Sequence, residues 1–208
     1  NLVDNSWFER EGVFNKEIVL KNKTKSWETT KDKISFPAGK TWLDYVQDTR
    51  LEISCGEAPY LVSRYDTTTG KFIKITDRIG ILDRKLRVVN ENLDSKSEWL
   101  EAVEIAYKST YGFEWQGDSL LLAREGLLVT FIENFNQKFD TEPSIEEIQN
   151  IAEIISWNIW QMDGLKGVIP NSCKDEIIDI SDFFETKTEI KKCKGCETQN
   201  IKSHNGIY

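Results

Sequence analysis

The stretch that decides the fold is Leu51-Glu-Ile-Ser-Cys-Gly-Glu-Ala-Pro-Tyr60. Residues 50–54 form a short apolar run typical of a strand, and Gly56 and Pro59 then force a turn. In open α/β sheets, ligands bind at the carboxyl ends of the strands, where a glycine turn lets the backbone approach them. The first candidate site therefore comprises Glu52 and the turn residues Cys55, Gly56 and Ala58.

Two further apolar runs also end in acidic residues. Residues 79–83 end at Asp83, and residues 158–163 end at Asp163. Carboxylates on successive strands can accept hydrogen bonds from ribose hydroxyls and from an adenine amine, so the three acids predict a nucleoside-binding crevice. The local alternatives are that Asp83 caps a helix that begins at Arg84, and that Asp163-Gly164 is an ordinary turn.

The region between these runs predicts three helices. Ser95-x-x-Glu98 has the pattern of a capping box, Asp118 precedes an apolar stripe that reaches Phe139, and Ser144-x-x-Glu147 begins a third helix. The pattern predicts an α/β fold with a Rossmann-like, partly parallel sheet and a helical insertion between its second and third strands. We divide the chain into an N-terminal arm (1–35), a central domain (36–170) and a C-terminal segment (171–208).

These motifs resemble those of S-adenosylmethionine-dependent N6-adenine DNA methyltransferases. Residues 51–60 are similar to the first motif of that family, residues 79–83 to the second and residues 160–164 to the third. Phe36-Pro37 lies upstream, where the family often has an aromatic residue or Thr before Pro. The stretch 36–170 resembles small proteins labelled as methyltransferase subunits of restriction endonucleases.

The resemblance implies an S-adenosylmethionine methyltransferase-type sheet in a restriction–modification setting, with DNA adenine-N6 methylation as the reaction. Glu52 would order the turn and the methionine ammonium group, with the main chain of Cys55, Gly56 and Ala58 nearby. Tyr60 would supply the aromatic residue of the first motif, Asp83 would hold the ribose and Asp163 the adenine amine. The implied partners are DNA and a restriction or specificity subunit.

The chain also departs from the family. Ala58 replaces the second glycine, and Ile53 stands where a proline usually follows the first acid. No Asn/Asp-Pro-Pro-Tyr/Phe motif occurs in the 208 residues, although the family uses it to hold the target base. No catalytic residue is therefore assigned. The leading alternative is a non-catalytic subunit or interaction protein with the methyltransferase fold.

A second alternative is a magnesium-dependent restriction nuclease. Asp83-Arg-Lys85 has the acid-x-Lys spacing of such enzymes, and Glu57 or Asp66 would supply a second carboxylate. In that chemistry the carboxylates hold the metal, and the lysine assists the attacking water.

The C-terminal segment predicts a metal site. Cys193-Lys-Gly-Cys196 places two thiols on one tight turn, Cys173 lies 20 positions earlier, and His204 lies eight positions later. This donor set matches a tetrahedral structural zinc site, which would order a segment that has few core residues. The alternatives are free thiols in a flexible tail and a redox pair. The basic residues around Cys193 could meet DNA phosphates.

Composition limits the remaining functions. The chain has a net charge of −8 and a pI near 4.9, so contact with DNA would depend on local basic segments or on a partner. No run approaches the ~20 apolar residues of a membrane span. Four cysteines favour a reducing cytoplasm, and the only histidine is His204, which argues against His-dependent nucleophilic catalysis.

Overall fold

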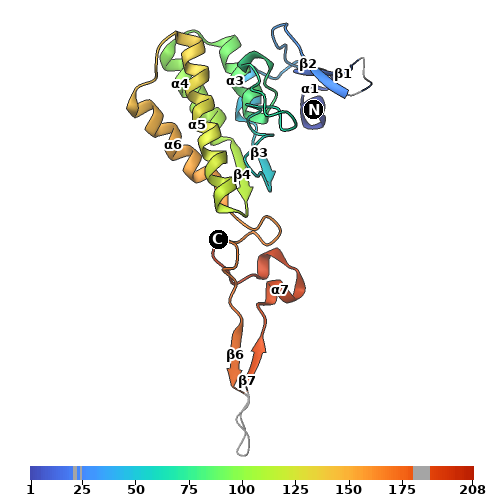
Figure 1. The fold of residues 1–208 in the computed structure, drawn as a ribbon, viewed down its shortest axis with the longest axis vertical. Coiled ribbons are helices and arrows are strands. Elements are labelled where there is room, and N and C mark those ends of the chain that lie inside the picture. Colours follow the sequence, from blue (N-terminus) through green and yellow to red (C-terminus); the bar gives the residue numbers. More distant parts are fainter. Residues whose placement is uncertain (21–22, 24, 180–187) are drawn as a thin grey trace, which may run out of the picture.

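The computed structural model describes residues 1–20, 23, 25–179 and 188–208. Its helices and strands form a mixed α/β part, from which an extended C-terminal hairpin projects (Figure 1). In chain order the elements are α1 (Leu2–Phe8), β1 (Asn15–Val19), β2 (Lys25–Thr29), α2 (Trp42–Gln47), β3 (Arg50–Ile53), η1 (Ile75–Asp77), α3 (Ile81–Asn92), α4 (Lys96–Lys108), β4 (Thr110–Glu114), α5 (Gly117–Phe139), α6 (Ile145–Asn158), β5 (Ile159–Gln161), β6 (Glu176–Asp179), β7 (Thr188–Lys191), α7 (Lys194–Thr198) and η2 (Ile201–Ser203).

A parallel three-stranded sheet lies at the centre of the α/β part. Its strand order is β3-β4-β5, and Ile53, Phe113 and Trp160 are neighbours across it. The strands follow one another across the sheet in chain order. The two right-handed connections, from β3 to β4 and from β4 to β5, therefore place their helices on the same face of the sheet. Figure 1 agrees, since α4, α5 and α6 stand on the left of β3 and β4.

The sheet differs from the predicted one in its middle strand. The expected strand 79–83 is instead the beginning of α3, where Gly80 is the N-cap and Asp83 accepts its N–H at 3.0 Å. The middle strand is β4, which lies within the stretch predicted to be entirely helical. The helical insertion is therefore split, with α3 and α4 before β4 and α5 and α6 after it. The strand predicted at 50–54, the strand at 158–163 and the three predicted helices are confirmed as β3, β5, α4, α5 and α6.

The core lies between the helices and the inner face of the sheet. Its largest fully buried side chains include Trp99, Tyr107, Phe131 and Phe135. Trp99 packs against both phenylalanines, with ring centroids 6.2 and 5.8 Å apart. Aromatic pairs of this kind stabilise a core beyond the area that they bury.

Residues 1–35 contribute to the same core. Phe8, Phe14 and Ile34 are buried in it. Asp4 of α1 is buried and forms ion pairs with Arg84 of α3 and with Arg50 of β3. Residues of the N-terminal segment are thus held against the rest of the α/β part by apolar contacts and by buried ion pairs.

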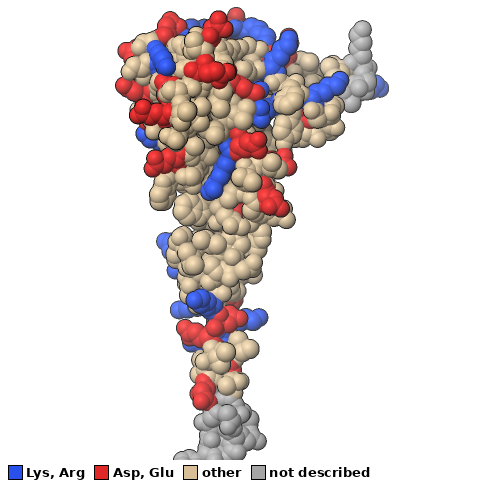
Figure 2. Space-filling view, turned by 60° about the vertical axis from the view of Figure 1, so that its left-hand side comes forward, with Lys and Arg blue, Asp and Glu red and all other residues tan. Residues whose placement is uncertain are grey.

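The C-terminal hairpin has almost no apolar interior. β6 and β7 pair in antiparallel register from Glu176–Lys191 to Asp179–Thr188, and every residue of both strands is exposed. In the view of Figure 2, separate patches of charged side chains are scattered over the helical part of the molecule, and the narrower region between that part and the hairpin is largely uncharged. None of the helices in the described ranges has both the length and the apolar character that a membrane span requires.

Candidate functional site

Four ligand-type side chains converge in the C-terminal segment. The Sγ atoms of Cys173, Cys193 and Cys196 and the Nδ1 atom of His204 all lie within 4.8 Å of one another. The three Sγ–Nδ1 distances are 3.4, 3.8 and 3.6 Å, in the same order. A tetrahedral zinc ion with Zn–S near 2.3 Å and Zn–N near 2.0–2.1 Å places S and N ligands about 3.6 Å apart. The cluster therefore has the donor set and the dimensions to hold zinc.

The local backbone explains how the cluster forms. Cys193 is the N-cap of α7 and Cys196 lies in its first turn, so one tight turn presents both thiols. Gly195 is buried between them, and a Cβ built there would lie 2.5 Å from Cγ of His204. The absence of a side chain at Gly195 thus lets the histidine approach the two cysteines.

The surroundings of Cys193 and Cys173 shift the pKa values of the two thiols in opposite directions. The backbone N–H of Asn205 donates to Sγ of Cys193 at 3.4 Å and is the main reason that the pKa of this thiol is lowered to about 6. Desolvation raises the pKa of Cys173 to about 11, and the neighbouring thiols of Cys196 and Cys193 make a smaller contribution in the same direction. Cys193 is therefore readily ionised, whereas Cys173 is not. Because zinc binds thiolates, a bound zinc ion would have to promote the ionisation of Cys173.

The cluster also lies where the C-terminal segment meets the α/β part. The N–H of Ile169 donates to the carbonyl of Ile207 at 2.7 Å, and Gly206 packs against Val168 and Ser172. Val168 is buried, whereas the hairpin beyond is exposed. A metal here would fix the path of the chain at the base of the hairpin.

A second group of polar residues lies at the carboxyl edge of the parallel sheet. Glu52 is on β3, Glu114 ends β4, and Asp163 follows β5 by two residues. Glu114 accepts the N–H of Gly56 through Oε2 at 2.7 Å and that of Gln116 through Oε1 at 2.9 Å. The glycine turn after β3 is therefore joined directly to the acid of the next strand.

The turn itself has an unusual backbone. Ser54, Gly56 and Ala58 all have positive φ angles, of 61°, 58° and 61°. Cys55 and Ala58 are buried, whereas Tyr60 is 73% exposed. Positive φ is costly for residues other than glycine, and such strain is often found at functional turns.

Glu52 is the least satisfied carboxylate of this edge. Its Oε2 atom is buried and has no hydrogen-bond partner among the described residues. Desolvation raises the pKa of Glu52 to about 7. Ionised Glu52 and Glu114 also contribute to raising the pKa of Cys55 to about 12, after burial of the thiol itself. Cys55 is consequently an unreactive thiol beside two carboxylates.

Asp163 closes a turn. Its Oδ1 atom accepts the N–H groups of Leu165 and Lys166 at 3.0 and 3.1 Å, and its own N–H donates to Val168 at 2.8 Å. This is the ordinary-turn alternative that the sequence offered, although the turn does stand at the predicted edge of the sheet.

Asp83 does not lie at a strand end, which corrects its predicted position. Oδ2 of Asp83 accepts the N–H and hydroxyl of Ser63 and the N–H of Gly80, at 2.7 to 3.0 Å. Burial raises its pKa. Asp83 thus caps α3 from its third helical position and ties the preceding loop to it, whereas the helix-cap alternative placed Asp83 at the N-cap of a helix that begins at Arg84. The acid beside the glycine turn is Glu114, which the sequence interpretation missed.

Lys85 also lies in an unexpected environment. It is 1% exposed, and its ammonium group donates to the carbonyls of Asp48 and Ser109 and to the Ser109 hydroxyl. On a helix, side chains two positions apart point in nearly opposite directions, so Asp83 and Lys85 cannot share a site as they would on a strand. The acid-x-Lys nuclease geometry is therefore not formed.

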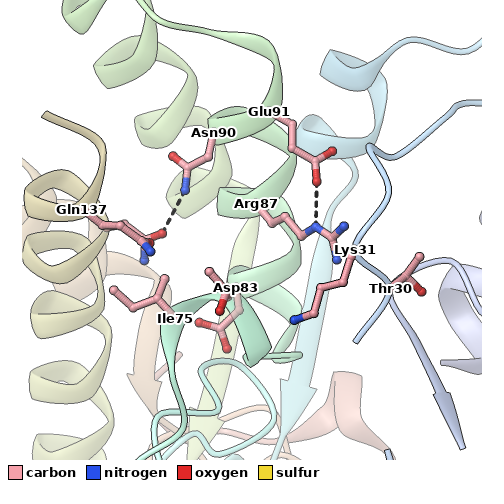
Figure 3. Close-up of a pocket in the computed structure, with 10 residues that line it drawn as sticks. Thr30, Lys31, Ile75, Asp83, Arg87, Asn90, Glu91 and Gln137 are labelled. Carbon is pink, nitrogen blue, oxygen red and sulfur yellow. Dashed lines mark hydrogen bonds and ion pairs between the residues drawn. The ribbon is translucent and has the colours of Figure 1, made fainter. Parts of the chain in front are cut away.

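The buried Asp83 borders a cavity of about 290 Å³ that is drawn in Figure 3. Arg87 and Glu91 pair across its wall at 2.7 Å, and Asn90 donates to Asn134 at 3.1 Å. A larger cavity of about 400 Å³ lies beside the glycine turn and includes Tyr60, Tyr65 and Trp27 in its lining.

Comparison with known proteins gave no relative. No family model matches the chain, and neither a curated protein nor a solved structure matches it.

Proposed function

We propose that the protein binds one structural zinc ion through Cys173, Cys193, Cys196 and His204. The observation that carries this proposal is the set of three Sγ–Nδ1 distances of 3.4 to 3.8 Å. These match the edge of a zinc tetrahedron, and all four positions are filled by protein ligands, as in structural rather than catalytic sites. The ion would replace the apolar core that the C-terminal segment lacks.

Metal analysis of the purified chain tests this function, with Cys193→Ser and His204→Ala as the variants. We expect one zinc ion per chain in the wild type and a loss of bound zinc in both variants. Cys55→Ser is the matched control, because Cys55 is also buried but belongs to the sheet edge. Wild-type protein that neither contains nor takes up zinc, or a Cys193→Ser variant with unchanged zinc, would refute the proposal.

We further propose that the carboxyl edge of the sheet binds S-adenosylmethionine. The observation that favours this is the contact between the N–H of Gly56 and Glu114, which joins a glycine turn to the acid of the adjacent strand. In dinucleotide-binding folds a glycine turn after one strand lets the backbone approach the ligand, and an acidic residue further along the chain accepts a hydrogen bond from the ribose. Glu114 replaces Asp83 as the proposed ribose acceptor, while Glu52 and Asp163 keep their proposed roles.

Adenine-N6 methylation of DNA in a restriction–modification system is the activity that this cofactor would serve. The chain lacks the Asn/Asp-Pro-Pro-Tyr/Phe motif, so we assign no catalytic residue. The alternative proposal is a cofactor-binding but non-catalytic subunit. DNA contact would come from basic residues such as Lys191, Lys192 and Lys194, or from a partner subunit.

Calorimetric titration with S-adenosylmethionine tests the cofactor proposal. We expect the wild type to bind and Glu114→Gln to bind at least about tenfold more weakly, a loss of about 1.4 kcal/mol. Asp83→Asn is the informative control, because Asp83 caps α3 and is not at the strand end. No heat of binding with folded wild-type protein, or equal affinity in Glu114→Gln, would contradict the proposal.

A further inference from the structure

The outward face of the parallel sheet is apolar and open. Its side chains are Leu51 and Ile53 on β3, Tyr111 and Phe113 on β4, and Trp160 on β5, which share one side by their register. Leu51 and Ile53 are 46% and 53% exposed, and the other three are partly exposed. We call these five residues the outer sheet face.

Two exposed side chains extend the outer sheet face. Trp157 is 66% exposed, and its ring lies 6.2 Å from that of Trp160. Gly164 packs against Ile53, and the adjacent Leu165 is 89% exposed. When these exposed fractions are applied to large apolar side chains of roughly 150–250 Å² each, the seven residues leave on the order of 600 Å² of accessible apolar surface.

Such a face is unusual for a parallel sheet. Parallel strands are normally covered by helices on both faces, because their side chains are apolar on both sides. Here the unidirectional strand order places the connecting helices on one side only. The exposed area also reaches the upper end of about 300–600 Å² for the largest patch on a typical monomer.

We propose that a second copy of this chain covers the outer sheet face, in a symmetric dimer. A standard protein–protein interface buries about 800 Å² on each partner and weak ones about 600 Å² or less, so on the order of 600 Å² of apolar surface is the area that a weak dimer needs. In a two-fold interface each copy presents the same surface. Two flat sheets can pack face to face about 10 Å apart, with their side chains interdigitated.

Charge on the face itself does not oppose this occupant. The chain has a net charge of −8, so most ways of bringing two copies together place acidic surfaces near each other. The outer sheet face consists of Leu, Ile, Tyr, Phe and Trp, and none of these five residues is charged. Two copies can therefore meet on this face without opposing like charges across its centre.

Sedimentation velocity of the purified full chain tests the proposal. We expect a concentration-dependent equilibrium between a monomer and a dimer of twice its mass. Trp157→Glu and Leu51→Glu place a charge in the interface of each copy, and we expect each to weaken dimerisation by at least about tenfold. Trp157 lies at the end of α6 and is largely exposed, so this variant should fold even if a change in β3 does not.

Ile145→Glu is the matched control. Ile145 begins the same helix, is 76% exposed, and lies about 18 Å from Trp157 along the helix axis. We expect its dimer to be as stable as that of the wild type. A wild type that remains monomeric at roughly 100 µM, or a dimer unaffected by folded Trp157→Glu, would overturn the proposal.

Discussion

Replacing Gly195 with alanine gives a sharp test of how the metal cluster is built. An alanine Cβ at this position would lie 2.5 Å from both Cγ and the backbone nitrogen of His204, and 2.7 Å from its Cα. Ordinary van der Waals contacts begin at 3.4 Å. Two of the three atoms are backbone, so His204 cannot escape by rotating its side chain and must withdraw by roughly 0.9 Å.

This displacement is large compared with the tolerance of a zinc site. Ligand distances in such sites hold within about 0.2 Å, so the Nδ1 atom would leave the tetrahedron or strain it. Changes to groups that merely orient zinc ligands cost about 10–100-fold in metal affinity. We therefore expect Gly195→Ala to weaken zinc binding by about 1.4–2.8 kcal/mol while all four ligands remain present.

Competition against a chromogenic zinc chelator measures the effect. Gly117→Ala is the control, because a Cβ at the start of α5 would meet nothing closer than Nε2 of Gln161 at 3.9 Å. Zinc affinity in Gly117→Ala should equal that of the wild type. If Gly195→Ala retains zinc within about twofold of the wild type, the close approach of His204 to this glycine is not what assembles the cluster.

Three further predictions concern the buried charges of the α/β part. Burial lowers the pKa of Lys85 from 10.5 to about 7, so between these pH values the unfolded chain holds a proton that the native protein lacks, and stability rises with pH. In urea unfolding at pH 7 and pH 9, the gain in stability should be smaller by about 2 kcal/mol in Lys85→Met, and equal gains would contradict the assignment. Burial raises the pKa of Glu52 from 4.5 to about 7, so in this window the native protein holds the extra proton and stability falls as pH rises. The melting temperature of Glu52→Gln relative to the wild type should therefore be higher at pH 8 than at pH 5, and a constant offset would speak against it. Asp4→Asn leaves Arg84 and Arg50 without their shared carboxylate, and we expect a loss of about 3–5 kcal/mol in the free energy of unfolding, measured with denaturant. A loss below about 1 kcal/mol would mean that solvent replaces the carboxylate easily.

The strands show where local sequence patterns are sufficient and where they fail. β3 and β5 are predicted correctly, because each is a short apolar run bounded by turn residues. Residues 79–83 have a similar pattern, but a short apolar run does not distinguish a buried strand from the first turn of a helix. The residue that distinguishes the helix from a strand is Asp83, three positions after Gly80. At this spacing a carboxylate can accept the backbone N–H of the N-cap residue, as Asp83 does here.

Of the two candidate sites, one could be predicted from local sequence and the other could not. The cysteine cluster could be predicted because Cys-x-x-Cys is a local motif and the chain has only one histidine to complete it. Glu114 could not be recognised locally, since its importance depends on β4 pairing with β3 some 60 residues earlier in the chain. A strand at β4 could have been recognised from its alternation. Thr110, Gly112 and Glu114 face inward, and Tyr111 and Phe113 face outward.

The buried pairing of Asp4 has a consequence for the order of folding. Its partner Arg84 lies 80 positions later, so α1 cannot complete this contact until α3 has been synthesised. With seven residues, α1 is too short to be stable as an isolated helix. On the ribosome, the first residues of the chain should therefore be among the last to take their place, after the region around α3 has formed a surface to receive them.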